Sequence, residues 1–294
     1  MELIGKITGI NTSDGMCNIA VIDKEGNLTN LKLGIEEAKG LKNGSVYKFL
    51  YNVVEGERIS NYIYSINDIN DLELVEKDSV LRAFFPNSPI SLDSAKKEIN
   101  NYLNKIENKI IKDITKGLIN KYNNDFFTYP AATKMHHAYI GGLAYHSVGM
   151  LHMADSFIEN YPYLNQDYIY AGIMLHDIGK TIELTGAANA EYSLKGQLLG
   201  HLVIGAMEIG NMAKALGYED NEEVLFLEHM LVSHHGMPQF GSAKKPMTAE
   251  ALVLWYIDTI DSKFRVLGEE LSKTEKGTYT ESIGVLDRAK IYKI

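Results

Sequence analysis

The chain has 294 residues, of which 45% are hydrophobic and 23% charged, an ordinary composition for a globular protein. This length suits one large domain or two smaller domains of roughly 100–200 residues each. The single cysteine, Cys17, excludes an intrachain disulfide, and no apolar run approaches the ~20 residues that cross a bilayer. Because the first residues also lack the basic start and apolar stretch of a signal peptide, we expect a cytoplasmic protein without a membrane partner.

The net charge of −9 argues against a protein that simply coats nucleic acid, since binding along a phosphate backbone relies on Lys and Arg. It does not exclude an enzyme that grips a few nucleotides. Bound metal ions would supply positive charge that a count of side chains misses.

The first part of the chain, residues 1–75, reads as a small β-domain. Apolar and β-branched clusters separated by turn signals predict five strands, at residues 3–10, 17–22, 28–33, 46–54 and 59–66. A brief helix-like insert is expected over residues 35–39. This pattern suits a small closed barrel of the OB type, although another small β-domain would satisfy it too. Charge does not decide whether the domain binds nucleic acid, because it holds 7 basic and 11 acidic side chains.

Residues 76–125 are expected to form a connector that contains a long amphipathic helix. Pro86 and Pro89 mark a break, and Ser91 is a plausible N-cap. Apolar residues then repeat at three- and four-residue spacing, at positions 99, 103, 106, 110, 114 and 118. Residues 77–121 contain 9 basic and 5 acidic side chains, which indicates either a solvated helix face or a strip that guides a phosphate backbone.

From residue 126 to 294 the pattern is helical. Segments near 135–160, 166–179, 195–216, 222–235 and 248–268 carry apolar residues at helical spacing, and Gly179, Gly217 and Gly236 lie where C-terminal caps are expected. The sequence therefore predicts an α+β protein, with a small OB-like β-barrel followed by an all-α bundle.

The residues that carry chemistry lie in this helical region. All nine histidines fall between positions 136 and 235. One candidate ligand or adjacent pair occurs on each successive predicted helix, namely His146, His176–Asp177, His201, His234–His235 and Asp258. Ligands from separate helices that converge inside a bundle are a known way to build a metal site. Imidazole suits first-row transition metals, a carboxylate can bridge two ions, and such a pair of ions supports in-line phosphoester cleavage.

This set resembles the binuclear form of the HD phosphohydrolase pattern, which includes the stretches His176-Asp177-Ile178-Gly179-Lys180 and His234-His235-Gly236. The resemblance extends to the bacterial YhaM-type 3′→5′ exoribonucleases over the stretches 136–147, 170–180, 199–201 and 230–236. That family places an OB-type domain ahead of its HD domain. The similarity covers about residues 125–267 well and the N-terminal domain only loosely.

The resemblance implies two divalent metal ions. One would be held by His146, His176, Asp177 and Asp258, and the other by Asp177, His201, His234 and His235. Asp177 would thus be the shared, catalytically essential carboxylate, and Lys180 would meet the substrate phosphate. Manganese is the favoured metal, with iron, cobalt and magnesium as the alternatives.

Several residues keep two interpretations. His136 and His137 would contact phosphate or transfer a proton near the mouth of the site, or else would pack at a helix start. Asp258 and Asp261 share a helix face, so either could be the ligand, and the family pattern favours Asp258. Lys180 could instead offset the negative C-terminal end of a helix. His152 and His229 fall outside the pattern and are expected to be structural.

The leading functional hypothesis is a metal-dependent 3′→5′ exoribonuclease that releases nucleoside 5′-monophosphates from single-stranded RNA, with single-stranded DNA as a further substrate. A phosphodiesterase or phosphatase acting on a small nucleotide would use the same metals but would need no polymer-holding barrel. A nucleic-acid-binding regulatory protein with a vestigial site is the third hypothesis, although no ligand position has been lost. Assembly into a homo-oligomer stays open.

Overall fold

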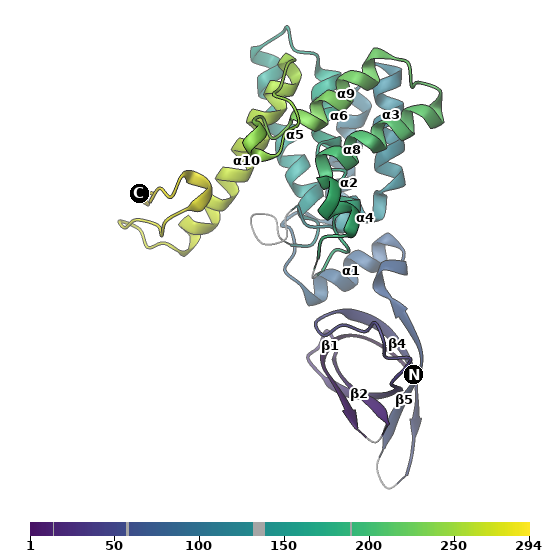
Figure 1. Ribbon diagram of the computed structural model, residues 1–294. Coiled ribbons are helices and arrows are strands. Elements are labelled where there is room, and N and C mark those ends of the chain that lie inside the picture. The colour runs from purple at the N-terminus through teal and green to yellow at the C-terminus, as the bar shows by residue number, and fades with distance from the viewer. Residues whose placement is uncertain (14, 57–58, 132–138, 189) are drawn as a thin grey trace. The chain divides into compact units, whose positions relative to one another are not determined.

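The computed structural model describes residues 1–13, 15–56, 59–131, 139–188 and 190–294. The chain divides into two compact units, Met1–Asn87 and Ser88–Ile294. The first unit contains the strands and the second is helical, as the ribbon in Figure 1 shows. The expected α+β class, with β structure first and a helical C-terminal region, is confirmed.

Five strands form the first unit: β1 (Glu2–Ser13), β2 (Met16–Ile22), β3 (Leu28–Gly34), β4 (Val46–Val54) and β5 (Ser60–Asp68). They close in the order β1-β2-β3-β5-β4. Four of the junctions are antiparallel ladders, whereas β3 and β5 meet in parallel at the single register pair Lys32 and Tyr62 among the described residues. This short seam gives a partly open five-stranded barrel, which is the OB type of architecture.

The barrel core follows from the alternation of its strands. Inward positions are apolar, and Ile7, Ile19, Leu31 and Phe49 are completely buried. Burial of each such side chain contributes roughly 1.5–3 kcal/mol, so the alternation fixes which face of each strand turns inward. The short helix expected over residues 35–39 is instead a series of turns closed by hydrogen bonds such as the one from the Ala38 N–H to the Gly34 carbonyl.

The first unit ends with η1 (Ile69–Asp71) and α1 (Leu74–Phe84). The single long helix expected next is two helices, α2 (Leu92–Lys105) and α3 (Lys109–Lys121), and both belong to the second unit. Ser91 caps α2 as predicted, because its side chain accepts a hydrogen bond from the Ser94 N–H. The break occurs where the buried Asp167 carboxylate accepts hydrogen bonds from the N–H groups of Glu107 and Asn108, at 2.7–3.1 Å.

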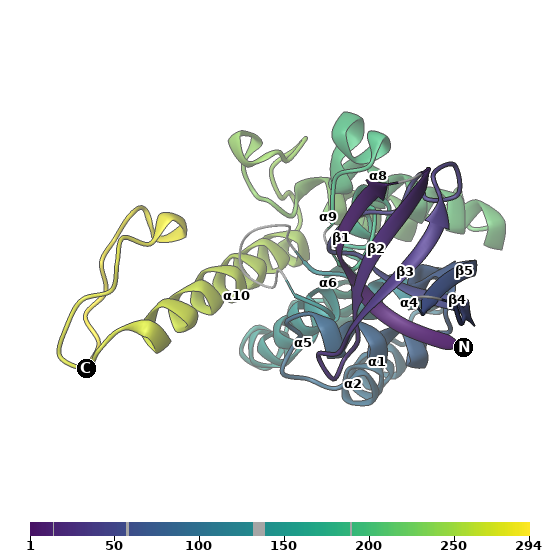
Figure 2. The ribbon, with the colours of Figure 1, turned by 90° about the horizontal axis from the view of Figure 1, so that it is seen from below.

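The second unit continues with α4 (Asn123–Thr128), α5 (Gly142–Asn160), α6 (Gln166–Leu175), α7 (Lys180–Glu183), α8 (Leu194–Leu216), α9 (Glu222–Ser233), η2 (Pro238–Phe240), α10 (Ala249–Lys273) and η3 (Gly284–Leu286). Helix α6 is apolar on all sides and packs against α3, α5, α9 and α10, so it is the central helix. Its C-terminal end therefore lies inside the bundle. Seen from below in Figure 2, α10 extends beyond the other helices of this unit.

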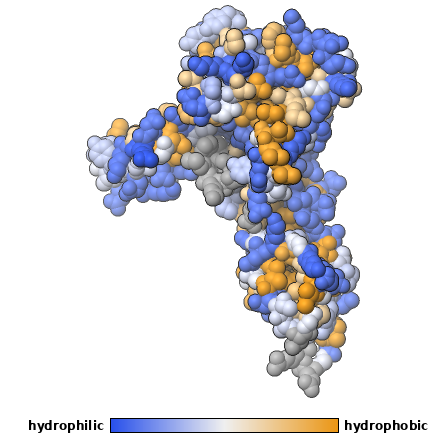
Figure 3. Space-filling view, viewed as in Figure 1, coloured by the Kyte–Doolittle hydropathy of each residue, from blue (hydrophilic) through white to orange (hydrophobic). Residues whose placement is uncertain are grey.

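Helix α8 contains a kink at Gly200. Gly200 has φ 70° and ψ 158°, a conformation that favours glycine, and it interrupts the helical backbone. Hydrophobic side chains gather on the surface over this helix in Figure 3, and the large exposed apolar residues of α8 are Leu194, Leu198, Leu199, Val203, Met207 and Leu216. His201, directly after the kink, is largely buried instead.

Within the described residues, none of the helices is both long enough and apolar enough to span a membrane.

Candidate metal centre

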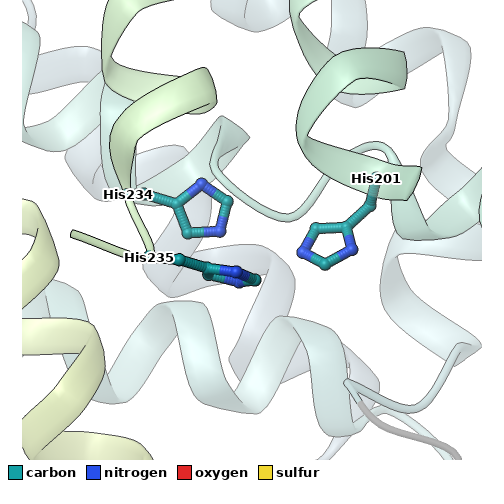
Figure 4. Close-up of side chains that lie close together, drawn as sticks. All are labelled: His201, His234 and His235. Atoms are coloured by element: carbon teal, nitrogen blue, oxygen red, sulfur yellow. The ribbon is translucent and has the colours of Figure 1, made fainter. Parts of the chain in front are cut away.

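Five histidines and two aspartates, carried by five different helices, converge inside the helical unit. The predicted ligands lie within α5 (His146), α8 (His201) and α10 (Asp258), and directly after α6 (His176 and Asp177) and α9 (His234 and His235). Figure 4 shows His201 facing His234 and His235 across the centre of this cluster. The histidines that the sequence singled out therefore lie together.

The two adjacent pairs share one local geometry. Each follows the last turn of a helix, where backbone carbonyl groups have lost their helical partners. The Nδ1 of His176 lies 2.8 Å from the Ile173 carbonyl oxygen, and the Nδ1 of His234 lies 2.7 Å from that of Leu231. Because a carbonyl only accepts, Nδ1 must donate in both rings. Each Nε2 is thereby left with a lone pair that is directed into the cluster.

His201 is held from α7. The Glu183 carboxylate accepts from the His201 backbone N–H at 3.0 Å and from its Nδ1 at 3.1 Å. Glu183 is ionised, since hydrogen bonds from His201 outweigh the effect of burial and lower its pKa. The close approach of the chain at this point requires Gly179, because a Cβ there would lie 2.2 Å from the His201 carbonyl oxygen. Glu183 was not among the residues predicted from the sequence.

His235 is oriented by the loop that follows it. Its Nδ1 lies 2.8 Å from the Phe240 carbonyl oxygen, at the end of η2. Gly236 makes the turn between them with φ 77°, and a Cβ at this position would lie 1.9 Å from the Trp255 ring. The glycine expected as a helix cap therefore also allows the Trp255 ring of α10 to pack directly against the backbone.

His146 lies between two carboxylates of α10. Its Nε2 is 3.2 Å from Asp258 Oδ1, and its Nδ1 is 2.8 Å from Asp261 Oδ2. Asp261 is in turn contacted by the Arg265 guanidinium, which also donates to the Tyr145 hydroxyl. Asp258 thus lies on the Nε2 side that the other histidines present to the cluster. This geometry supports Asp258 as the ligand and Asp261 as the group that orients the ring.

The ligand atoms form two groups with Asp177 between them. His146, His176 and Asp177 offer atoms that all lie within 4.8 Å of one another, and so do His201, His234 and His235. Asp177 Oδ2 is 3.2 Å from His176 Nε2, whereas its Oδ1 is 3.3 Å from His201 Nε2 and 3.8 Å from His234 Nε2. Each oxygen of this one carboxylate therefore faces a different group.

Several of these atoms are buried without a partner. Among the described residues, the Nε2 atoms of His176, His201 and His234 and the Oδ1 of Asp177 make no hydrogen bond. A buried polar atom left in this state costs about 1–3 kcal/mol. Four in one place indicate that something else satisfies them, and imidazole together with carboxylate is a donor set that suits divalent transition metals. The residues present therefore fit a divalent-metal centre.

The electrostatics of the centre agree with this assignment. Burial lowers the pKa of His234 far below its ordinary value and also lowers that of His235, so both rings are neutral and ready to coordinate. Burial would raise the pKa of Asp177, but Lys180 and His176 outweigh it and hold the pKa well below its ordinary value. His146 differs, because Asp258 and Asp261 outweigh its burial and raise its pKa to about 9. A metal ion must therefore displace a proton from His146.

Lys180 lies against the Asp177 carboxylate. Its ammonium donates to Asp177 Oδ2 at 2.7 Å and to the Ala131 carbonyl at 2.6 Å. Asp177 raises the pKa of Lys180 despite burial, so the group stays charged. Lys180 also lines a cavity of about 680 Å³ that opens beside His146, Asp177, His235 and Asp258. Two of the three donors of the ammonium are used, which leaves one for a ligand in the cavity.

The remaining histidines lie elsewhere or outside the described residues. His152 pairs with Glu98 at 3.2 Å near the surface, and His229 Nε2 accepts from the Met247 N–H at 3.0 Å. These contacts support the structural roles expected for both. His136 and His137, expected to contact the substrate, lie outside the described residues.

The comparisons with known proteins agree with this centre. The HD domain family matches residues 143–263, which contain every predicted metal ligand. The chain is 42% identical over 227 residues to the 3′-5′ exoribonuclease YhaM of Geobacillus sp. (strain WCH70). That alignment covers 76% of this chain and 70% of the relative. No solved structure matches the chain.

Proposed function

The chain belongs to the YhaM family of HD-domain 3′→5′ exoribonucleases, and from this premise we propose that it hydrolyses RNA from the 3′ end in a metal-dependent reaction. The observation that carries the proposal is the Asp177 carboxylate, whose two oxygens face two separate groups of imidazoles inside the bundle. A complete set of seven ligands, with buried atoms that lack partners, also argues against a regulatory protein with a vestigial site.

The proposed centre holds two divalent ions. One is assigned to His146, His176, Asp177 and Asp258, and the other to Asp177, His201, His234 and His235. We favour manganese, with iron, cobalt and magnesium as alternatives, because mixed imidazole and carboxylate ligation accepts each of them. When bound, the ions would activate a water molecule for in-line attack and offset charge on the phosphate oxygens.

The chain's own groups orient the substrate around this centre. The remaining donor of Lys180 is proposed to bind a non-bridging oxygen of the phosphate that is cleaved, where it stabilises negative charge in the transition state. Neutral His234 and His235 and the ionised Asp177 are in the protonation states that coordination needs. His136 and His137 are proposed to contact the substrate.

We propose single-stranded RNA as the substrate and nucleoside 5′-monophosphates as products, formed when the bond to the penultimate 3′-oxygen breaks. The 2′-hydroxyl is not the nucleophile in this reaction, so single-stranded DNA is expected to be cut as well. A base-paired 3′ end should stall the enzyme, because each base pair that is opened costs a few kcal/mol. The protein is proposed to act in the cytoplasm.

The barrel is proposed to hold the RNA. On the outward face of β5, Tyr62 is 38% exposed and Tyr64 is 60% exposed. The Lys32 ammonium of β3 lies 5.7 Å from the centre of the Tyr62 ring. Exposed aromatic rings stack on bases without regard to sequence, and a nearby cation binds the phosphate backbone. These three residues supply an aromatic and basic site despite the acidic balance of the domain.

The test uses two samples of the same RNA, one labelled at its 5′ end and the other at its 3′ end. Each sample is incubated with the protein and manganese. We expect the 3′ label to appear at once as a mononucleotide, while the 5′-labelled strand shortens step by step. Internal fragments, cyclic phosphates, or hydrolysis of small nucleotides without any cleavage of RNA would contradict the proposal. The last outcome would favour a small-nucleotide phosphodiesterase.

A further inference from the structure

The cavity beside the metal centre extends well beyond the metal ligands. One wall is the face of α10 that carries Trp255, Thr259, Ser262 and Lys263, in addition to Asp258. Phe240 and Val285 also line it. Its volume of about 680 Å³ lies within the range of ~300–1,000 Å³ typical of pockets that bury a small molecule or cofactor. The cavity therefore has room for a nucleotide next to the centre.

Phe240 combines two roles in one residue. Its backbone carbonyl accepts from His235 Nδ1 at 2.8 Å, which fixes the residue next to a predicted metal ligand. Phe240 is 63% exposed and lines the cavity. An aromatic ring held beside a phosphate-binding centre is placed to stack on the base of the nucleotide whose phosphate lies there.

Lys263 is the second unusual group in the cavity. It is half-buried, yet it forms no hydrogen bond or ion pair with any residue that the structure describes. Lys180 differs, because its charge is offset by Asp177 at 2.7 Å. A half-buried ammonium that is not paired with a carboxylate is a site that attracts an anion.

We propose that this cavity is a subsite for the 3′-terminal segment of the RNA, in which Phe240 stacks on the terminal base and Lys263 binds a phosphate. This inference rests on the proposed exoribonuclease function. The terminal nucleotide carries only the phosphate that is hydrolysed at the metal centre. Lys263 therefore binds the next phosphate upstream, and the subsite spans at least a dinucleotide.

The first experiment measures the affinity of a 5′-fluorescent single-stranded RNA by anisotropy, with calcium in place of manganese and with the strand checked for integrity afterwards. F240A should weaken binding roughly tenfold, because one base–aromatic stack is lost, whereas F240Y should bind like the wild type. Metal content should be unchanged in F240A, since the carbonyl that orients His235 belongs to the backbone. Equal affinity of F240A and wild type would overturn the role of Phe240.

The second experiment follows the salt dependence of the same binding. K263Q should reduce the slope of log affinity against log salt by about 0.7, the value for one lost phosphate contact on a single strand. The matched control is K214Q, which removes an exposed lysine of α8 outside the cavity and should leave the slope unchanged. Equal slopes for K263Q and K214Q would overturn the role of Lys263.

A third experiment uses a small substrate to distinguish the role of Phe240 from that of Lys263. A nucleoside 5′-p-nitrophenyl phosphate has a base and one phosphate but no upstream phosphate. F240A should raise its KM, and K263Q should leave its KM unchanged while raising the KM for RNA. A wild-type protein that binds RNA with these slopes but never cleaves it would refute the proposed function and not the subsite. Normal cleavage of RNA with full affinity in both variants would refute the subsite alone.

Discussion

The barrel and the helical unit bury different kinds of side chain. The barrel strands bury an apolar core, and the barrel's candidate binding groups, Tyr62 and Tyr64, lie on its outer face. The helical unit instead buries polar groups, among them His146, His176 and Asp177. Burial of such groups is costly unless each is held by a partner, and here each imidazole Nδ1 has one. The proposed binding groups of the barrel thus lie on its surface, whereas the candidate metal ligands lie in the interior of the helical unit.

The difference between the two units is tested most sharply by a variant that lacks the Asp177 carboxylate. Asp177→Ala removes the group whose oxygens face both sets of imidazoles, so both ions should be lost. Hydrolysis of RNA should fall by about a thousandfold or more, equal to roughly 4 kcal/mol of transition-state stabilisation. Affinity of the barrel for long RNA should persist, as measured by anisotropy. Retention of full activity in this variant would refute the site assignment.

The two carboxylates around His146 should have different effects on metal binding when each is replaced. Asp258→Asn is expected to remove one of the two ions, as counted by elemental analysis. Asp261→Asn should keep both ions but lower metal affinity by roughly 10–100-fold, the usual effect of losing a group that orients a ligand. The opposite ranking would make Asp261 the ligand and would contradict the geometry around His146 Nε2.

On the barrel, removal of either exposed tyrosine should weaken RNA binding and leave hydrolysis unchanged. Tyr62→Ala and Tyr64→Ala should each weaken affinity for long RNA by about 1–3 kcal/mol, the worth of one stacked base. Cleavage of a dinucleotide should be unchanged, because the predicted metal ligands all lie in the helical unit. A matched control is Tyr163→Ala, which removes an exposed ring of the helical unit. Equal losses on long and short substrates would contradict the division of roles.

The two units should also respond differently to pH. The pKa of His146 is raised to about 9, so below pH 9 a metal ion must displace a proton from this ring. Metal affinity should therefore rise with pH towards 9, by at most about tenfold per pH unit for one proton, and level off above it. The barrel contains no histidine, so its RNA affinity should stay flat between pH 6 and 9. Calorimetric metal titration in two buffers would count the proton released.

The features that could be predicted from the sequence are those whose physical cause lies in neighbouring residues. The five strands follow from apolar and β-branched clusters between turn signals. The ligand set follows from the resemblance to the HD pattern, which His146, His176 and His201 match on successive predicted helices. The break between α2 and α3 was missed, because apolar spacing continues across it and the group that holds it, Asp167, is about 60 residues away. The parallel pairing of Lys32 in β3 with Tyr62 in β5 also joins residues far apart in the sequence, so it required the fold itself.

Asp261, which orients His146, was singled out from the sequence, but the groups that orient the other four imidazoles were missed for a similar reason. Three of the five acceptors are backbone carbonyls, which carry no sequence signal. Glu183 lies 18 residues from His201 and accepts a hydrogen bond from its N–H directly after the kink at Gly200. Once a histidine pair follows a helix end, however, the carbonyl three residues earlier is a predictable partner for Nδ1.

The most direct test of the central claim is anomalous diffraction from crystals of the protein grown with manganese. Two anomalous peaks are expected, one beside His146, His176 and Asp258 and one beside His201, His234 and His235, with Asp177 contacting both. A single peak, or two peaks without Asp177 between them, would contradict a centre built on one shared carboxylate.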